Sequence, residues 1–466
     1  MKTKYSFKTI GILIFCFSIV GCKDFVDIEL PNSMIVDEIV FENDETAISA
    51  VQGLYYGLFN ANNFASGGPN SVTVISGLVA DEIESGFTTS DTDIEFNQND
   101  ITINNSGNGY LWSSAYNTIY MANAILEGLA TSKGVTEEVK KQLQGEALFI
   151  RAFTLFHLVN LYGNVPLVFT TDYRENALIS RTSETEVYTQ IITDLEEARG
   201  FLSIAYIGED RTRPNYYTAT ALLARVYLYI EEWEKAETMA EEVIGATEIY
   251  ELSDDINLVF LKNSHEAIWQ IKPVLAGSTK EGNLFIIESS SPRFKLRKAL
   301  VNSFEDEDLR LMNWIGTYTN DENQPIFYYP FKYKVKLSTG TPLEYSVVLR
   351  YAEQFLIRAE ARAQQEKLDE AIADLDKIRE RAGIPLIVDV QPEITKSTLL
   401  DTILQERRKE FFTEWGHRWL DLKRTNTADA VLGTLKPTWQ ATDILFPIPE
   451  TEITKNPNLK PNNDGY

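Results

Sequence analysis

Aromatic and polar side chains able to bind a ligand concentrate in two irregular stretches, residues 60–109 and 271–346. The first stretch is rich in Gly, Asn, Ser, Asp and Thr, and the second mixes Gly, Pro and aromatic residues. Segments of this length without regular patterning are usually functional or disordered. Flat rings with a few polar neighbours would suit a sugar, because rings contact C–H groups while polar groups hydrogen-bond to hydroxyls. The candidates are Phe64, Asp81, Glu84, Phe87, Phe96, Arg293, Trp314, Tyr318 and Tyr329, with Phe327, Tyr328 and Tyr333 as further aromatic residues.

Trp314 and Tyr318 are the strongest of these candidates, because they flank Gly316 in a sequence typical of a loop. Large aromatic residues also fill protein cores, so interior packing is the alternative for each candidate. Packing is the preferred interpretation for Trp112 and Tyr116, whose four-residue spacing is typical of one buried helix face.

Alternating oxygen donors of the kind that bind Ca²⁺ occupy residues 91–99. The pattern departs from an EF-hand, since Phe96 stands where glycine is needed and Thr102 where glutamate is needed. A solvated strand face or loop is the favoured interpretation, with a calcium site as the alternative. The donors are Asp91, Asp93, Glu95, Asn97 and Asn99.

Catalytic chemistry has little support in this sequence. The 3 histidines, His157, His265 and His417, are far apart and form neither metal-ligand nor triad spacing. Neither a Gly-x-Ser-x-Gly elbow nor a phosphate-binding glycine loop is present. Carboxylates are abundant, and a glycosidase needs only a pair of them, so composition alone does not exclude hydrolysis. We predict a protein that is not an enzyme and uses no metal or cofactor.

Cys22 ends the motif Ile19-Val20-Gly21-Cys22, which resembles the lipobox of bacterial lipoproteins. The apolar run 10–20 follows a basic start and is too short to cross a bilayer as a helix. We predict a signal peptide over 1–21 and lipidation of Cys22, which would tether the protein to a membrane. An uncleaved anchor or an ordinary secretory signal is the alternative.

The charge and cysteine content narrow the classes of protein. A net charge of −25 disfavours nucleic acid and anionic lipid headgroups as partners. The 2 cysteines are Cys16, inside the signal peptide, and Cys22, so we expect neither a disulfide nor a thiolate metal site in the processed chain. With 44% hydrophobic residues, a large core is available to stabilise the fold.

The elements that must position these residues are mostly helical. Apolar residues recur every three or four positions from Val139 to Tyr162, which predicts a helix that ends at Gly163. Two later segments share small or apolar residues at the same spacings, as in paired helices of the tetratricopeptide repeat. Coincidental spacing in ordinary helical hairpins is the alternative. The matching sets are Ala224, Ala236, Ala240, Val243 and Ala359, Ala371, Leu375, Ile378.

Ordered motifs along essentially the whole chain resemble the SusD/RagB family of outer-membrane nutrient-uptake lipoproteins. No single motif is decisive, and their order is the specific signal. They include Gly145–Phe153, Leu161–Val168, Arg213-Pro214, Ala221–Leu228, Arg350–Glu353, Glu406-Arg407-Arg408, Gly416-His417-Arg418 and Phe446–Pro449.

The resemblance implies a mainly α fold in which four tetratricopeptide-like helix pairs support a loop-rich ligand-binding face with short strands. It also implies a single domain over 22–466, and a SusC-like TonB-dependent outer-membrane transporter as partner, over which the protein forms a lid. Lys23-Asp24 resembles part of a surface-export signal in this group, although Phe25 replaces the second acid. Surface exposure on the outer membrane, through the lipid on Cys22, is therefore expected.

Several charged residues in the matching motifs are better explained by structure than by ligand chemistry. On amphipathic helices they would form ion pairs at helix contacts, where loss of one partner leaves the other charge unpaired. This set is Arg151, Glu406, Arg407, Glu410, Arg418 and Asp421.

We predict a non-catalytic surface lipoprotein that captures an oligosaccharide or polysaccharide and delivers it to the transporter. Capture of peptides or glycopeptides with the same partner is one alternative, since aromatic residues suit either ligand. A tetratricopeptide-type scaffold that binds another protein is the second alternative.

Overall fold

The computed structural model describes residues 40–60, 63–86, 89–274, 277–319 and 325–466. The predicted signal peptide 1–21, the lipidation candidate Cys22 and the binding candidate Phe87 lie outside these ranges, so those expectations stay predictions. Across the described ranges, none of the helices combines the length and apolarity needed to span a membrane.

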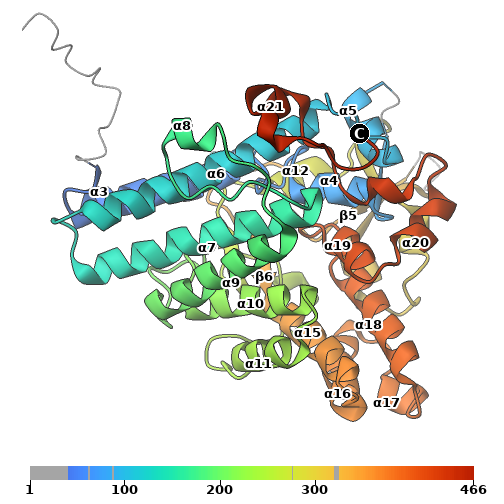
Figure 1. The fold of residues 1–466 in the computed structure, drawn as a ribbon. Coiled ribbons are helices and arrows are strands. Elements are labelled where there is room, and N and C mark those ends of the chain that lie inside the picture. The colour runs from blue at the N-terminus through green and yellow to red at the C-terminus, as the bar shows by residue number, and fades with distance from the viewer. Residues whose placement is uncertain (1–39, 61–62, 87–88, 275–276, 320–324) are drawn as a thin grey trace, which may run out of the picture.

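Long helices stack in chain order, each against the next (Figure 1). The predicted helix over 139–162 is α7, which ends where Gly163 adopts a left-handed φ of 69°. Four pairs are α3 with α6, α7 with α9, α10 with α11, and α15 with α16, and α18 closes the stack against α15 and α16. The helices are α3 (Asp44–Phe59), α6 (Ser106–Thr131), α7 (Glu137–Tyr162), α9 (Glu184–Phe201), α10 (Tyr216–Tyr229), α11 (Trp233–Ile244), α15 (Tyr351–Gln364), α16 (Leu368–Ala382) and α18 (Lys396–Glu410).

The repeated alanine spacing corresponds to two of these pairs. Ala224 of α10 and Ala236 and Ala240 of α11 are fully buried, as are Ala359 of α15 and Ala371 of α16, and the two helices of each pair pack against each other. Small side chains let the paired helix axes approach closely, as the sequence pattern predicted. The mainly α fold is confirmed, and the tetratricopeptide interpretation of the alanine spacing stays a prediction beside coincidental spacing in ordinary helical hairpins.

The described part of the stretch 60–109, expected to be loop-rich, contains two short helices in addition to β1 and the start of α6. Helix α4 (Val72–Val79) is buried along its whole length, and Ser71 caps its N-terminus. Helix α5 (Asp91–Gln98) begins at the N-cap Ser90 and ends at Asn99, which has a left-handed φ of 58°. The mostly polar sequence obscured α5, whereas α4 is a short apolar run of a kind that helices and buried strands share.

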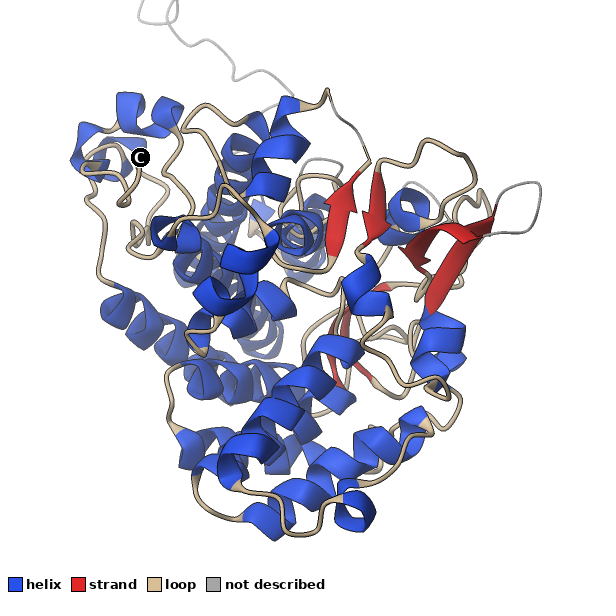
Figure 2. Cartoon of the chain, turned by 90° about the vertical axis from the view of Figure 1, so that its right-hand side faces the viewer, coloured by secondary structure: helices blue, strands red, loops and turns tan. Residues whose placement is uncertain are grey.

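The stretch 271–346 contains β3, β4 and β5 and meets β2 and β6 at its two ends, and the strands lie in the right half of the molecule in Figure 2. All pairings are antiparallel: β1 with β3, β2 with β6, and β4 with β5, and β3 also packs beside β5. These elements are β1 (Ile83–Ser85), β2 (Ala267–Ile271), α12 (Lys280–Phe285), β3 (Phe294–Leu296), α13 (Lys298–Val301), α14 (Leu309–Trp314), β4 (Ile315–Thr319), β5 (Pro325–Pro330) and β6 (Ser346–Arg350).

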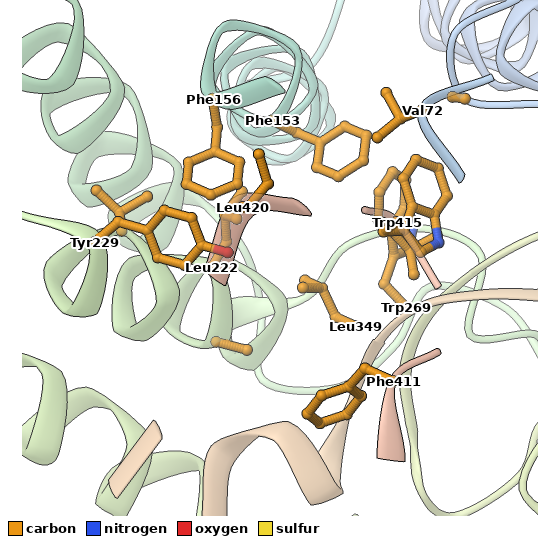
Figure 3. Close-up of a cluster of buried hydrophobic side chains, with 14 of the residues drawn as sticks. Val72, Phe153, Phe156, Leu222, Tyr229, Trp269, Leu349, Phe411, Trp415 and Leu420 are labelled. Atoms are coloured by element: carbon orange, nitrogen blue, oxygen red, sulfur yellow. The ribbon is translucent and has the colours of Figure 1, made fainter. Parts of the chain in front are cut away.

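An aromatic cluster joins the helical stack to this strand region (Figure 3). The Phe153 ring of α7 lies 5.1 Å from the Trp269 ring of β2 and 5.3 Å from the Trp415 ring. The Trp415 Nε1–H donates to the Val347 carbonyl of β6 at 2.8 Å. Because the cluster is drawn from three distant chain segments, it fixes the strand region on the helical scaffold.

The remaining C-terminal elements wrap around the same scaffold. Asn108 of α6 donates to the Pro447 carbonyl at 2.8 Å, and Phe446 N–H donates to the Leu161 carbonyl at 2.8 Å, which holds the extended tail in place. The elements not yet named are α8 (Tyr173–Asn176), η3 (Ile256–Leu258), α17 (Ile387–Val390), α19 (His417–Arg424), α20 (Ala428–Leu435), η4 (Ala441–Ile444), α21 (Glu450–Lys455) and η5 (Pro457–Leu459).

The charged motif residues form buried ion pairs, as predicted. Each of the six has a partner of opposite charge on another helix or segment, so their role in the described structure is packing. The pairs are Arg151–Asp194, Glu406–Arg310, Arg407–Asp421, Glu410–Arg350 and Arg418–Asp81, at 2.7, 2.6, 2.8, 2.5 and 2.7 Å.

Candidate ligand-binding surface

The β4–β5 hairpin presents three aromatic rings on one face. Its register pairs Tyr318 with Phe327 and Gly316 with Tyr329. Residues two apart on a strand point to the same side, so Tyr318, Phe327 and Tyr329 share that side. All three are half-buried, which leaves part of each ring open to solvent.

The three rings are held in place by cross-strand packing. Tyr318 and Phe327 stack with centroids 6.3 Å apart and an interplanar angle of 19°. The Tyr329 ring lies directly over Gly316, where an added Cβ would come within 2.2 Å of it. Tyr329 also meets Phe331 edge to face at 5.7 Å. The rings therefore form a preorganised row, with glycine providing space for one of them.

Charged groups from the neighbouring strands border this row. Lys295 of β3 has its Nζ 5.2 Å from the Phe327 ring centroid and 3.0 Å from the Glu84 Oε1 of β1. Arg297 Nη1 lies 3.5 Å from the other Glu84 oxygen. The Lys295 and Glu84 side chains are 27% and 35% exposed, so both can still reach a ligand. We call Glu84, Lys295, Tyr318, Phe327 and Tyr329 the hairpin surface.

A hollow of about 550 Å³ adjoins the hairpin surface at Tyr329. Lys336 and Glu288 form an ion pair of 2.9 Å beside it, and Leu337 is 73% exposed. The volume is in the range of pockets that hold small ligands. The lining is Ile286, Ile287, Glu288, Tyr329, Phe331, Lys334, Val335, Lys336 and Leu337.

Burial shifts the pKa of two side chains that line this hollow. It lowers the pKa of Lys334 to about 8, against the opposing effect of Glu344, and the Lys334 Nζ donates to the Phe331 carbonyl at 2.5 Å. Burial, with the nearby Glu288 carboxylate, raises the pKa of Tyr329, so its hydroxyl stays protonated at neutral pH. The Tyr329 hydroxyl can thus both donate and accept a hydrogen bond, which suits a sugar hydroxyl.

Trp314, the first choice from sequence, does not belong to this surface. It is 0% exposed, its Nε1–H donates to the Ile256 carbonyl at 3.1 Å, and the Lys332 Nζ lies 4.9 Å from its ring centroid. A fully enclosed indole has no face open to a sugar, so the prediction for Trp314 is wrong. The packing alternative was correct.

Three candidates from the first stretch are also buried. Phe64 packs 6.1 Å from Phe153, and Phe96 packs 5.7 Å from Phe446, each with 1% exposure. Asp81 is enclosed by Arg408 and Arg418, and although burial raises its pKa, these guanidinium groups lower it below the ordinary value overall. The sequence interpretation of these side chains as ligand contacts is therefore wrong.

Arg293 and the suspected calcium loop meet in one ion pair. The Arg293 guanidinium holds the Asp93 carboxylate of α5 with contacts of 2.9 and 3.0 Å. Glu95 accepts from the Thr102 N–H at 2.9 Å and from Asn105 at 2.8 Å. Residues 91–98 are helical, so alternating donors diverge around the axis instead of converging on an ion. Neither the strand nor the loop interpretation is correct.

No cluster of His, Cys, Asp and Glu among the described residues is arranged to hold a metal ion. His157 and His417 are buried, and burial lowers the pKa of His157 to about 3, so it stays neutral at physiological pH. Phe153 packs against the His157 imidazole at 4.7 Å, which makes this ring part of the aromatic core.

Of the residues predicted from the sequence, Tyr318, Tyr329 and Glu84 converge on the hairpin surface, whereas Arg293, which directly precedes β3, is paired with Asp93 of α5. Lys295 and the hollow residues Phe331 and Lys336 were not singled out. The alternation of Lys295 with buried neighbours in Phe294–Leu296 was the available signal for an outward-facing side chain.

A stack of helix pairs therefore carries the strand region and its row of three half-exposed rings. Residues 25–228 match the family described as starch-binding and associating with the outer membrane, and residues 322–466 match the SusD family. The chain belongs to the SusD/RagB family of carbohydrate-binding proteins.

Individual relatives agree with this assignment along the chain. SusD-like protein P2 of Formosa agariphila is 26% identical over 98% of this chain and 99% of its own length. A SusD superfamily structure from Bacteroides vulgatus shares the fold with a TM-score of 0.81 at 23% identity, covering 91% of this chain and 100% of that one. A structure named laminarin-binding SusD-like protein has a TM-score of 0.78 at 24% identity, covering 91% and 100%.

Proposed function

We propose that this protein is a non-catalytic glycan-binding lipoprotein that captures oligosaccharide on the hairpin surface and delivers it to a SusC-like TonB-dependent transporter. The observation that carries the proposal is the row of Tyr318, Phe327 and Tyr329, three half-exposed rings on one face of a hairpin. Such faces contact the C–H groups of successive sugar rings, while Glu84 and Lys295 are placed to hydrogen-bond hydroxyls.

The choice of glycan follows from family and surface chemistry. A structure with the same fold is named laminarin-binding, which makes laminarin the first probe. Oppositely charged Glu84 and Lys295 neutralise each other beside the rings, so the surface favours a neutral polysaccharide over a phosphorylated or sulfated one.

Affinity electrophoresis through gels that contain laminarin, starch or xylan tests the capture step. We expect at least one of these neutral glycans to slow the purified protein while a neutral synthetic polymer does not. Equal mobility in every gel would contradict glycan capture. Release of reducing ends from the bound glycan would instead contradict the non-catalytic assignment.

Delivery and anchoring require separate measurements, because they rest on the family resemblance and on Cys22. The wild-type protein should fractionate with outer membranes and co-purify with a transporter barrel, whereas Cys22→Ala should lose membrane attachment. A protein that never co-purifies with a barrel would overturn the lid role and leave glycan capture standing.

A further inference from the structure

A second hollow is lined by residues of α6, α8 and α21. These helices lie in the upper part of Figure 1. Its volume is about 390 Å³, and we call it the α6 groove. Trp112, Tyr116 and Tyr120 line it from successive turns of α6, because a four-residue spacing repeats on one face of a helix. Tyr173 of α8 and Glu452 of α21 line it from other sides.

The inner part of the α6 groove is rigid. Trp112 is 3% exposed and its ring packs against Tyr116 at 4.8 Å and Tyr162 at 4.9 Å. The Tyr116 hydroxyl donates to the Pro166 carbonyl at 3.0 Å, which fixes the half-buried ring against the following loop. The expected packing role of these residues is therefore correct, and their packing also shapes the groove floor.

The outer part presents open aromatic surface from two separate segments. Tyr120 is 49% exposed and Tyr173 is 78% exposed. Asn123 ties α6 to the loop before α8 through a 2.9 Å hydrogen bond to the Val168 carbonyl, so the two rings are carried by connected elements. Tyrosine suits such a position, since its ring gives apolar contact and its hydroxyl gives a hydrogen bond.

Polar groups at the groove are few and balanced in charge. The Lys455 Nζ lies 2.7 Å from the Glu452 Oε1, and these side chains are 71% and 23% exposed. The Thr171 hydroxyl already donates to Glu127 at 2.6 Å. A paired cation and anion beside tyrosines favour a neutral ligand with hydroxyls and apolar faces over a phosphate or a strongly charged peptide.

A neighbouring hollow of about 440 Å³ also has Glu452 and Lys455 in its lining, and it includes Tyr110 of α6, 48% exposed. Tyr110 and Tyr120 are about 15 Å apart along the helix axis at 1.5 Å per residue. The combined length suits an oligosaccharide better than a single small molecule.

We propose that the α6 groove is a second binding site of this chain, for a neutral oligosaccharide segment. The choice of ligand rests on the proposed function, but the residues are independent of the hairpin surface. Two sites on one chain would raise the avidity for a long polysaccharide without any additional contact at either site.

Calorimetry tests this proposal. The ligand is a neutral oligosaccharide prepared from the glycan that retards the protein, which is laminarin, starch or xylan. The double variant Tyr318→Ala/Phe327→Ala removes the rings of the hairpin surface, so that binding at the α6 groove can be measured alone. The double variant Tyr120→Ala/Tyr173→Ala removes the open rings of the groove, so that binding at the hairpin surface can be measured alone. Tyr56→Ala, at a residue of α3 that is 43% exposed, is the matched control. We expect two sites per chain in the parent and Tyr56→Ala proteins and one in each double variant. Either single groove substitution should weaken the groove about tenfold, the size of one aromatic contact.

One site per chain in the parent, lost in Tyr318→Ala/Phe327→Ala and unaffected by Tyr120→Ala/Tyr173→Ala, would overturn the second site and leave the proposed function intact. Failure of all three glycans to bind the folded parent would overturn both. Circular dichroism of every variant separates lost binding from lost folding.

Discussion

Trp314 and Tyr318 are four residues apart, yet they belong to regions with opposite properties. Trp314 lies in a charged interior where Arg310, Glu410 and Lys332 are buried and paired. Tyr318 lies on the hairpin surface, where rings are half-exposed. The difference teaches that the same residue types stabilise the scaffold when enclosed and become available to a ligand when a strand carries them outward.

Removing one carboxylate from the charged interior should cause a large loss of stability. Burial alone would raise the pKa of Glu410, but Arg381, Arg350 and Arg310 hold it well below the ordinary value. Glu410→Ala leaves these guanidinium groups without that partner, so we expect the free energy of unfolding to fall by about 3–5 kcal/mol. Urea denaturation measures it. Arg174→Ala, which removes an exposed pair, is the control and should change stability little.

Trp314→Ala should separate stability from binding. Loss of a fully buried indole leaves a cavity and costs about 3–5 kcal/mol of unfolding free energy. Glycan affinity of the folded protein should stay unchanged, because the ring has no open face. Denaturation and calorimetry on the same preparation provide the test. A loss of glycan affinity without a loss of unfolding free energy would show that Trp314 contributes to the ligand site.

Glu82 and Glu84 are two residues apart, and their different burial extends the comparison to the effect of pH on stability. Burial raises the pKa of Glu82 to about 8, against the backbone hydrogen bond from Thr413, whereas Glu84 lies partly exposed on the hairpin surface. The folded state retains the Glu82 proton after the unfolded chain releases it near pH 4.5, so this group lowers stability as pH rises from about 4.5 to 8.

We expect Glu82→Gln to remove that contribution, on the order of 3 kcal/mol between pH 5 and pH 8. Urea denaturation of the parent and Glu82→Gln at both pH values measures the change. The variant should gain relative stability at the higher pH, and a constant difference between the proteins at the two pH values would show that Glu82 does not titrate in this way.

Gly316→Ala should displace the Tyr329 ring from the row of three aromatic rings on the hairpin surface. The added Cβ would come 2.2 Å from the Tyr329 ring, so the ring must move at a cost of about 1–3 kcal/mol, and glycan affinity should fall with it. Gly200→Ala in α9, where nothing lies within 4 Å of the added carbon, is the matched control and should retain affinity. Unfolding free energy and glycan affinity should be measured on the same variant. Unchanged values of both would contradict the role of Gly316.

Tyr318→Ala should have the smallest effect on the fold and a selective effect on the ligand. Loss of one half-exposed ring should weaken glycan binding about tenfold, or about 1.4 kcal/mol, with little change in unfolding free energy. Calorimetry beside the control Tyr56→Ala measures it. Equal loss in both variants would indicate a nonspecific effect of removing surface tyrosines.

Much of the scaffold could be predicted from the sequence because its signals are local. Alanine spacing around Ala224 and Ala359 identified two helix pairs, and the order of family motifs gave the fold class. The short helix α5 was missed, although Ser90 is an N-cap residue, because its mostly polar sequence lacks an apolar stripe.

The hairpin surface could be predicted only in part. Sequence composition placed Tyr318, Tyr329 and Glu84 in a candidate stretch, but it could not distinguish them from Trp314. That distinction depends on strand register, which pairs Gly316 with Tyr329, and on Lys332 reaching the Trp314 ring from a distant segment. Such long-range contacts leave no periodic signal in the sequence.

A crystal structure of the protein with the oligosaccharide selected by affinity electrophoresis tests the central claim most directly. The account predicts sugar rings lying over Tyr318, Phe327 and Tyr329, with hydroxyls within hydrogen-bonding distance of Glu84 or Lys295. A bound oligosaccharide that leaves all three rings uncovered would contradict it.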